Sequence, residues 1–534
     1  MSTTTNPLPH SMTTTTEPSS LPISSRIDLL QSLPYDVVIT ILSFLTQQDC
    51  LRCLEVCREW CTLIPMYARE TVFREIQLDE QYLGDNKSMH KFLGPHVDAV
   101  SFKKCHRLDR VLDMLHAKQC SNIQRLDFTG GVWLSRRHIA MVTKRLPMFP
   151  GITDLRLEYV DNGYDVYSLM TQCMIQCPLL ECLWIIPTPA TFYIDPHDDD
   201  VAIPLATTTT THNTNMSFLR LRFDDEVDNA RLASALSSCP NLTRLSITTY
   251  SDPEPFIFEQ CPRLQYLEWN PRTEDFYLWP SPLYKKKVDQ GLHYLATTDT
   301  ALSCMLRHRH HRIQTLKLVD MSYDHEPETM RFLDTSCRHV EEIMFDPLES
   351  LEIPRQLLPK LAHLSRLTLS ILDPDTAEGL VDYFMNHANI IRLETLEINL
   401  PIAHSLTKVL EAMACVSTLK HVEISPACVE EGTLKTYIMH APQLEHLCMD
   451  HAPVLSLETF TLLGQLPHLR ILTMASYYNA EPVSGAGIKA LVDKKKSNPS
   501  FSLSITCKRV EDDKGYIKYA QDQLGGRFSF IMLD

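Results

Sequence analysis

Glycine is scarce in this sequence: its 534 residues contain 15 glycines against 33 prolines. Nucleotide-binding α/β enzymes use glycines in their phosphate loops, so the scarcity argues against that class. Long apolar runs are also missing. The longest strongly apolar run, from Val37 to Leu45, has nine residues, whereas a membrane-spanning helix needs about 20. A transmembrane protein is therefore excluded, and so is one compact core, because single cores stop growing at roughly 250–300 residues.

Positive charge is in deficit as well. Lysine and arginine total 50 against 66 aspartates and glutamates, which gives a net charge of −16. Proteins that bind nucleic acids or anionic membranes need a basic surface. The charge balance therefore argues against nucleic-acid and membrane partners.

The N-terminal residues have neither the basic nor the apolar region of a secretory signal. We therefore expect the 17 cysteines to be reduced thiols that pack as small hydrophobes. Cys50, Cys53, Cys57 and Cys61 lie on one continuous stretch and cannot surround a metal ion tetrahedrally. No metal site and no cofactor are expected.

Beyond residue 93 a short phrase recurs, with apolar residues at positions 1, 4 and 6. Clear copies begin at Leu242, Leu264, Leu444 and Leu469. The looser copies begin at Val97, Ile123, Ile152, Leu180, Phe218, Ile313, Val340, Leu364, Leu393 and Leu419. Eleven of the thirteen intervals between these anchors lie between 22 and 29 residues, close to the period of leucine-rich repeats.

Between the anchors the apolar spacing changes to that of a helix, as at Leu108, Val111, Leu112 and Leu115. Prolines near the next anchor end each helix. Each unit is therefore predicted to be a strand followed by a helix. The fold class expected is α/β, a leucine-rich-repeat solenoid of about 14 degenerate repeats, preceded by a small all-α module.

The chain is predicted to divide into four parts. These are a disordered Ser/Thr/Pro-rich tail at 1–26, a helical module at 27–66, a linker at 67–93 and the solenoid at 94–534, with inserts near 187–215 and 270–305. The second insert is expected to contain either one divergent repeat near 291–305 or an aromatic loop. Both inserts are either partner-binding loops or tolerated surface insertions.

The helical module carries more apolar side chains than about 40 residues can bury, which favours a permanent protein partner. Its first helix is expected to begin at Pro34, Asp49 is expected to cap a second helix, and Pro65 is expected to end the segment. The apolar and motif positions run without a gap through this stretch. They are Leu33, Pro34, Val37, Ile41, Leu45, Leu51, Val56, Cys57 and Trp60.

This pattern, from Leu33-Pro34 to the Val-Cys-Arg-x-Trp close at Trp60, resembles an F-box. An F-box followed by leucine-rich repeats is the layout of the F-box/leucine-rich-repeat family. The resemblance implies a non-catalytic substrate receptor of an SCF-type cullin ubiquitin ligase in the cytoplasm or nucleus. It implies that Leu33 and Pro34 insert into a Skp-type linker protein, through which a cullin-RING ligase is engaged. The other residues of the set are shared between that contact and the F-box core.

The repeats would then hold a protein substrate of unknown identity, through the variable residues on the strands. In the first half these are Arg125, Arg156, Trp184, Arg220, Arg222, Arg244, Tyr266 and Glu268; in the second half they are Lys317, Arg366, Glu397, His421, Glu423 and His446. The run of arginines points to an acidic or phosphorylated ligand, or else merely solvates a strand face.

Two other functions remain open from the residues alone. One is a repeat scaffold that binds a partner in a Skp-containing complex without ligase activity. The other is an enzyme with a site in the 270–305 insert, although no catalytic motif supports it. Gly485-Ala-Gly487-Ile-Lys-Ala490 matches a loose dinucleotide fingerprint, but that fingerprint needs a strand directly before it. The motif is expected to begin the final outer helix instead.

Overall fold

The computed structural model describes most of the chain. The described residues are 29–69, 71–79, 89–105, 107–161, 165–188, 212–223, 227–249, 256–271, 292–297, 312–321, 337–348, 357–371, 374–387, 392–405, 407–450, 452–453, 455–476, 482–511 and 515–532. The predicted tail at 1–26 lies outside them. So do 189–211 in the first predicted insert and most of the second. Within the described residues, no helix is long and apolar enough to cross a membrane.

The N-terminal module consists of α1 (Leu29–Ser32), α2 (Tyr35–Ser43), α3 (Gln47–Cys53) and α4 (Trp60–Ala68). Three details differ from the sequence expectation. The helix expected to be first, α2, is preceded by α1 and begins at Tyr35, with Pro34 as its N-cap. Thr46, not Asp49, is the N-cap of α3; Asp49 is three residues further on and completes a reciprocal capping box with it. Pro65 does not end the segment but lies inside α4, because Ile64 and Ala68 beside it are fully buried and hold the helix in place.

A single parallel sheet of 18 strands follows, and each strand pairs with the next one along the chain. The strands are β1 (Glu75–Asp79), β2 (Ala99–Lys103), β3 (Arg125–Gly130), β4 (Asp154–Val160), β5 (Cys182–Pro187), β6 (Phe218–Arg222), β7 (Arg244–Thr249), β8 (Tyr266–Pro271), β9 (Tyr294–Thr297), β10 (Thr315–Met321), β11 (Glu342–Leu348), β12 (Arg366–Ile371), β13 (Thr395–Ser405), β14 (His421–Cys428), β15 (His446–Asp450), β16 (Ile471–Ser476), β18 (Ser502–Cys507) and β20 (Phe528–Met532). A separate pair joins β17 (Val483–Ser484) to β19 (Val510–Glu511).

Helices connect many of these strands. They are α6 (Leu108–Ala117), α7 (Arg136–Arg145), α8 (Val166–Gln176), α9 (Asn229–Ser237), α10 (Phe256–Gln260), α14 (Pro374–His387), α15 (Thr407–Met413), α16 (Glu431–His440), α17 (Leu457–Gln465), α18 (Gly485–Lys495) and α19 (Tyr516–Leu524). Short 3-10 turns occur at Met89–Lys91, Leu146–Met148, Leu358–Lys360 and Gly525–Arg527. The strand-then-helix unit repeated in one direction makes the fold a leucine-rich-repeat solenoid, as predicted.

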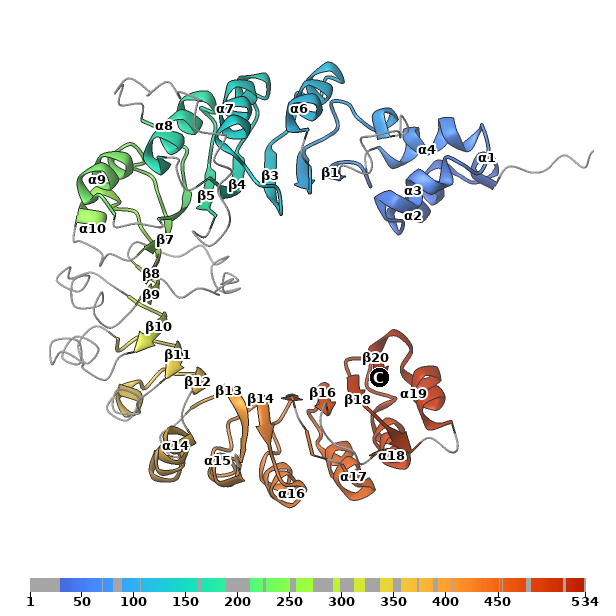
Figure 1. The fold of residues 1–534 in the computed structure, drawn as a ribbon. Coiled ribbons are helices and arrows are strands. Elements are labelled where there is room, and N and C mark those ends of the chain that lie inside the picture. Colours follow the sequence, from blue (N-terminus) through green and yellow to red (C-terminus); the bar gives the residue numbers. More distant parts are fainter. Residues whose placement is uncertain are drawn as a thin grey trace, which may run out of the picture.

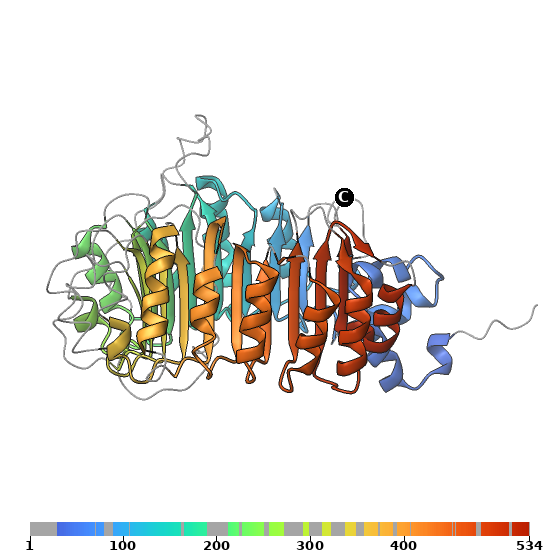
Figure 2. The same ribbon diagram turned by 90° about the horizontal axis from the view of Figure 1, so that it is seen from below.

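The solenoid curves into an open arc (Figure 1). Its strands line the inner, concave side and its helices cover the outer side, while the view from below shows the strands running alongside one another (Figure 2). Helices α1–α4 stand at one end of the arc, and α19 and β20 stand at the other (Figure 1). The two ends lie on the same side of the molecule, facing each other across the opening.

Fourteen of the strands follow the predicted anchors, and the structure adds β1, β9, β18 and β20. One anchor is shifted. Met216, not Phe218, is the buried residue three positions before the first strand leucine, Leu219, whereas Phe218 is half-buried on the strand itself. Strand β9 lies in the second insert and pairs with β8 and β10, as a divergent repeat near 291–305 would.

The sheet also starts earlier than expected. Strand β1 lies inside the predicted 67–93 linker and pairs along its whole length with β2. Its two inward side chains, Ile76 and Leu78, are buried like those of the later strands. The signal for this repeat is present in the sequence, because Phe73, Ile76 and Leu78 stand at positions 1, 4 and 6 of the recurring phrase, 24 residues before Val97.

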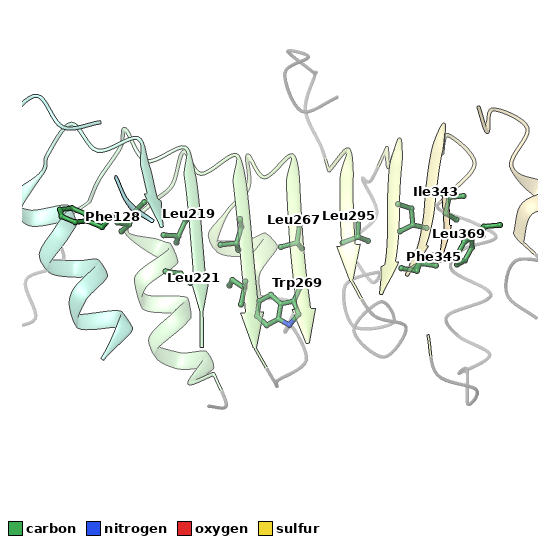
Figure 3. Packing of buried hydrophobic residues seen from close by; sticks show 14 of the residues in the cluster. Phe128, Leu219, Leu221, Leu267, Trp269, Leu295, Ile343, Phe345 and Leu369 are labelled. Atoms are coloured by element: carbon green, nitrogen blue, oxygen red, sulfur yellow. The ribbon is translucent and has the colours of Figure 1, made fainter. Parts of the chain in front are cut away.

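The core is a stack of leucine ladders between the sheet and the outer helices (Figure 3). Leu219, Leu267 and Leu295 occupy one level across the strands, and all are fully buried. Trp269 fills the next level on β8 and is the largest fully buried side chain. Each such side chain contributes about 1.5–3 kcal/mol on burial, so the ladders hold the arc together one repeat at a time.

Candidate functional site

Helix α2 exposes an apolar stripe. Val37, Ile41 and Phe44 follow one another at i, i+4 and i+7, which places them along one side of the helix. Their exposed fractions are 41%, 42% and 83%. Val38 and Leu42, which directly follow Val37 and Ile41 in the chain, are buried in the module. Large apolar side chains exposed in a row mark a surface that binds a partner. Val37, Ile41 and Phe44 are called the α2 stripe below.

The nine motif residues predicted for linker binding and the F-box core separate by exposure. The exposed members are Pro34, Val37, Ile41 and Val56; the half-buried ones are Leu33, Leu45, Cys57 and Trp60; Leu51 is buried. Leu51 packs in the core with Cys50, which is fully buried. Burial raises the pKa of the Cys50 thiol to about 12, so it is a packing residue rather than a reactive thiolate.

Two exposed aromatic residues are absent from the predicted set. Phe44 is the most exposed large apolar side chain of the described residues, and Tyr35 is 54% exposed, with its ring 5.3 Å from the ring of Tyr67 on α4. Phe44 lies seven residues after Val37, so helical spacing alone could have placed it on the stripe. Tyr35 carries no such signal, because its exposure depends on how α2 meets α4.

Gln47 joins the helical module to the edge of the sheet. Its side-chain amide donates hydrogen bonds to the backbone carbonyls of Val72, at 3.1 Å, and Glu75. Its Oε1 accepts the backbone N–H of Gln77 on β1, at 3.2 Å. Gln47 therefore satisfies backbone groups on the outer edge of β1, as a neighbouring strand would. The contact fixes α3 against the first repeat.

On the concave face, the register aligns the outward side chains into rows. The central row runs through Asp127, Arg156, Trp184 and Arg220 on β3 to β6. Arg156 donates to both carboxylate oxygens of Asp154, at 3.1 and 2.8 Å, and lies 3.7 Å from Asp127. Burial lowers the pKa of Arg156 while the bonds to Asp154 raise it, and the net direction is upward. The guanidinium is thus held charged between two carboxylates.

Trp184 lies between two guanidinium groups. The Arg156 Cζ lies 4.4 Å from the centre of the indole ring and the Arg220 Cζ lies 5.0 Å from it. The ring of Phe218 meets the same indole edge-on, with centroids 5.8 Å apart. Cation–π contacts of this kind order a guanidinium without using its N–H donors.

Other predicted substrate contacts are placed differently. Arg125 pairs with Glu75 across the sheet at 3.1 Å. Tyr266 is only 8% exposed and stacks on Tyr294 with ring centroids 4.1 Å apart. Burial also raises the pKa of the Tyr266 hydroxyl. Tyr266 is therefore part of the packed strand face and not an accessible contact, because a stacked aromatic pair buries both rings.

Arg222 and Arg244, two further first-half candidates, are half-buried on β6 and β7. The candidate Glu268 is buried on β8, where it accepts a hydrogen bond from the Ser246 hydroxyl at 2.7 Å. Arg244 is the register partner of Phe218, one row before Arg220. The structure therefore brings Trp184, Arg220, Arg222 and Arg244 together on three adjacent strands. It separates them from Arg125 at the start of the sheet.

The candidates in the second half of the concave face also include charges that are paired within the sheet. The buried ammonium of Lys317 lies 3.1 Å from Asp346, and Arg366 lies 3.5 Å from Glu342. Burial raises the pKa of Glu342, which Arg366 and Thr315 partly offset. These charges are paired with one another within the sheet. They therefore contribute to the stability of the concave face rather than to ligand binding.

The glycine motif at 485–490 begins α18, and the two-residue strand β17 precedes it. A side chain at Gly485 or Gly487 would collide with the Glu511 carbonyl or the Phe460 ring, at 2.0 and 2.4 Å from the added carbon. Close packing therefore accounts for both glycines. α18 is not the final outer helix, since α19 follows it. Within the described residues, no group of three or more His, Cys, Asp or Glu side chains is placed to hold a metal ion.

The comparison with protein families identifies one segment: residues 30–69 match the F-box-like family model. This range covers α2, α3 and α4 and contains the whole α2 stripe. No curated protein sequence matches the chain.

Among solved structures, the chain is similar to an internalin (InlF) from Listeria monocytogenes strain 4b F2365. The identity is 13% over 73% of this chain and 89% of that chain, with a TM-score of 0.35. It is also similar to TLR13 in its complex with ssRNA13, at 12% identity over 86% of this chain and 62% of that chain, with a TM-score of 0.44. At these scores neither structure carries an argument about function.

Proposed function

We propose that this protein is a substrate-receptor subunit of an SCF-type cullin ubiquitin ligase. In this proposal the α2 stripe docks on a Skp-type linker protein, and the concave face of the solenoid holds a protein substrate. The observation that carries the proposal is the α2 stripe itself. It is an exposed apolar row inside the segment that matches the F-box-like model.

The charge and burial of the two surfaces support this division of roles. The α2 stripe is apolar, which fits a lasting contact that excludes water. The concave face is polar and charged, which fits selective recognition of another protein. The chain itself performs no chemistry in this proposal and needs no cofactor. Its work belongs in the cytoplasm or nucleus.

Rate enhancement would come from geometry. A receptor that holds a substrate near a charged conjugating enzyme raises the effective concentration of the substrate lysine. That gain depends on a fixed distance between the two docking surfaces, because a loose joint spreads the substrate over a larger volume. The Gln47 contact between α3 and β1 and the continuous leucine ladders supply such rigidity.

The test is co-purification of the full chain with a Skp-type linker and a cullin. We expect the wild-type chain to retain both, and the double variant Val37→Asp/Phe44→Asp to lose both. Met439→Asp is the matched control, since Met439 is 60% exposed on α16, away from the module. Capture of the linker without the cullin would instead favour a scaffold in a Skp-containing complex without ligase activity. Capture of neither would contradict the F-box assignment.

A further inference from the structure

The two edges of the large sheet are finished differently. At the β1 edge, the side chain of Gln47 forms hydrogen bonds with the backbone groups of Glu75 and Gln77. At the other edge, β20 pairs with β18 along its whole length and, within the described residues, with no strand beyond it. An open sheet edge is a template for a further strand. The described part of this sheet therefore ends in an open edge at β20.

The β20 edge lacks the features that usually prevent strand addition. Its sequence, Phe528-Ser-Phe-Ile-Met532, contains no charged residue and no proline. Ile531 is 52% exposed and Met532 is 63% exposed, so apolar surface lies beside the open edge. Natural edge strands commonly avoid pairing through charged side chains or prolines, and terminal repeats of solenoids commonly have a polar outer face. The edge of β20 is therefore suited to receive another strand.

The hydrogen-bond pattern shows which backbone groups of β20 face the open edge. In a parallel sheet, successive residues direct their backbone groups to alternate neighbouring strands. The N–H of Ser502, on the concave side of β18, donates to the preceding Arg470 carbonyl at 2.7 Å. The same pattern directs the N–H of Ser529 to β18. It directs the N–H groups of Phe530 and Met532 to the open edge.

The N-terminal segment of the chain is tethered within reach of this edge. Helices α1–α4 stand at one end of the arc and face β20 across its opening (Figure 1). Residues 1–28 precede α1 and lie outside the described residues. Twelve residues of extended chain span up to about 40 Å. Attachment at α1 therefore gives residues 1–16 a high effective concentration at the β20 edge.

One stretch of this segment has the composition of a strand. Prolines at positions 7, 9, 18 and 22 interrupt residues 1–28, and a proline inside a strand removes a ladder hydrogen bond. The longest stretch between these prolines is 10–17. Its central residues, 11–16, are uncharged and include four threonines. Threonine is β-branched and favoured in strands, so residues 11–16 suit the uncharged edge of β20.

A second copy of the chain suits this edge less well. Two β20 edges paired antiparallel, about a twofold axis perpendicular to the sheet, would keep both concave faces on the same side. The second solenoid would then continue the curve of the first toward the helical module that faces β20 (Figure 1). A single strand covers the edge without extending the arc in this way.

We propose that residues 11–16 of this chain add to the β20 edge as a further strand and close the last repeat. Their backbone groups pair with the outward backbone groups of Phe530 and Met532, and their threonine side chains pack beside Ile531. The N-terminal segment thereby ties the helical module to the far end of the arc. This inference does not depend on the proposed function, because it requires neither a linker protein nor a substrate.

The test is hydrogen exchange, resolved to single backbone amides by mass spectrometry, in the full chain and in its Thr13→Pro/Thr14→Pro variant. Two adjacent prolines are used because neighbouring residues direct their N–H groups to opposite sides of a strand, so one proline falls on the bonded side. The Phe530 and Met532 amides should exchange at least about tenfold faster in the variant, because they lose their acceptors. The Ser529 amide bonds to β18, and its unchanged exchange would show that the last repeat remains folded.

Thr3→Pro/Thr4→Pro is the matched control. It makes the same two changes in the same segment but outside residues 11–16, so exchange at Phe530 should stay within about twofold of wild type. Equal acceleration by both double substitutions would overturn the proposal, and so would Phe530 and Met532 amides that exchange equally fast in all three chains. Protection of these amides that rises with protein concentration and survives both double substitutions would assign the edge to a second copy instead.

Discussion

In the helical module, α2 leaves Phe44 83% exposed, while in the solenoid the strand leucines of every central repeat are fully buried. Both regions are built from short apolar elements, but they differ in what covers them. Each repeat packs on its neighbours, so a solenoid closes its own core unit by unit. Within the described residues, the helical module contacts the sheet edge at β1 and the turn at Met89–Lys91, while the α2 stripe on its other side is exposed.

The charged residues show the reverse difference. The solenoid's concave face engages most of its charges internally, as Arg156 does with Asp154 and Asp127. The α2 stripe has no charged residue to engage. One end of the molecule thus exposes an apolar row, which suits an apolar contact. The described part of the concave face is polar and charged, with cations and carboxylates held next to one another on adjacent strands.

The largest expected effect separates the two faces of α2. Leu42→Asp places an unpaired carboxylate in the core, since Leu42 is 2% exposed. It should destabilise the helical module by more than about 4 kcal/mol. Val37→Asp, on the exposed side of the same helix, should change stability by less than about 1 kcal/mol. Urea unfolding monitored by helical circular dichroism compares the two, and equal destabilisation would show that the α2 stripe is part of the core.

A core truncation in the solenoid should come next. Leu367 on β12 is fully buried between the ladders of β11 and β13. Leu367→Ala removes buried methyl groups and leaves a cavity, which should cost about 2–5 kcal/mol. Hydrogen exchange of the central strands measures the loss. Protection that fell only at the ends of the arc would contradict a core that is continuous from repeat to repeat.

The junction between the two regions should respond less. Gln47→Ala removes two hydrogen bonds to β1 and one to the Val72 carbonyl just before it, with an expected loss of about 1–3 kcal/mol in the free energy of opening that edge. Gln48→Ala is the control, because Gln48 is exposed on the same helix and should change it by less than about 0.5 kcal/mol. The hydrogen-exchange rate of the Gln77 backbone amide measures the opening of this edge directly. Equal exchange in both variants would remove Gln47 as the contact that fixes the module.

The smallest effect concerns pH. Because burial raises the pKa of Glu342 above its ordinary value of 4.5, the folded state keeps a proton that the unfolded state has released. Stability should therefore fall as the pH rises from about 4.5 through the raised pKa, by at most about 1.4 kcal/mol per pH unit for one group. Glu342→Gln should make this decline shallower, measured by denaturant titration at several pH values. If the decline in stability with pH is unchanged in this variant, another group is responsible for it.

The repeat architecture was predictable because its signal is periodic. The anchors at Leu242, Leu264, Leu444 and Leu469 each precede a strand whose leucines are buried. The anchor at Phe218 was wrong by two residues because a long insert removes the spacing that fixes the position. Strand β20 departs from the consensus, since it is an end repeat and its side chains are largely exposed. Strand β1 keeps the consensus at Phe73, Ile76 and Leu78 and could have been predicted from the same spacing.

The helical module shows what a linear pattern leaves undecided. Apolar residues at Val37, Val38, Ile41 and Leu42 cover an arc of about 140° around α2, so the pattern does not show which edge of this apolar arc faces the core. The choice is made by contacts with α3 and α4, which depend on tertiary packing. On the concave face the sequence identifies the arginines, but only the register shows that Arg156 is engaged and that Trp184 lies between it and Arg220.

The most direct test of the central claim is a calorimetric titration of a purified Skp-type linker into the full chain and into its Val37→Asp/Phe44→Asp variant. We expect one linker to bind one wild-type chain, with a negative heat-capacity change from the buried apolar surface. The variant, with its solenoid melting unchanged, should bind at least 100-fold more weakly. Equal affinity of the two chains for the linker, or no binding by the wild-type chain, would contradict the assignment of the α2 stripe as the linker-docking surface.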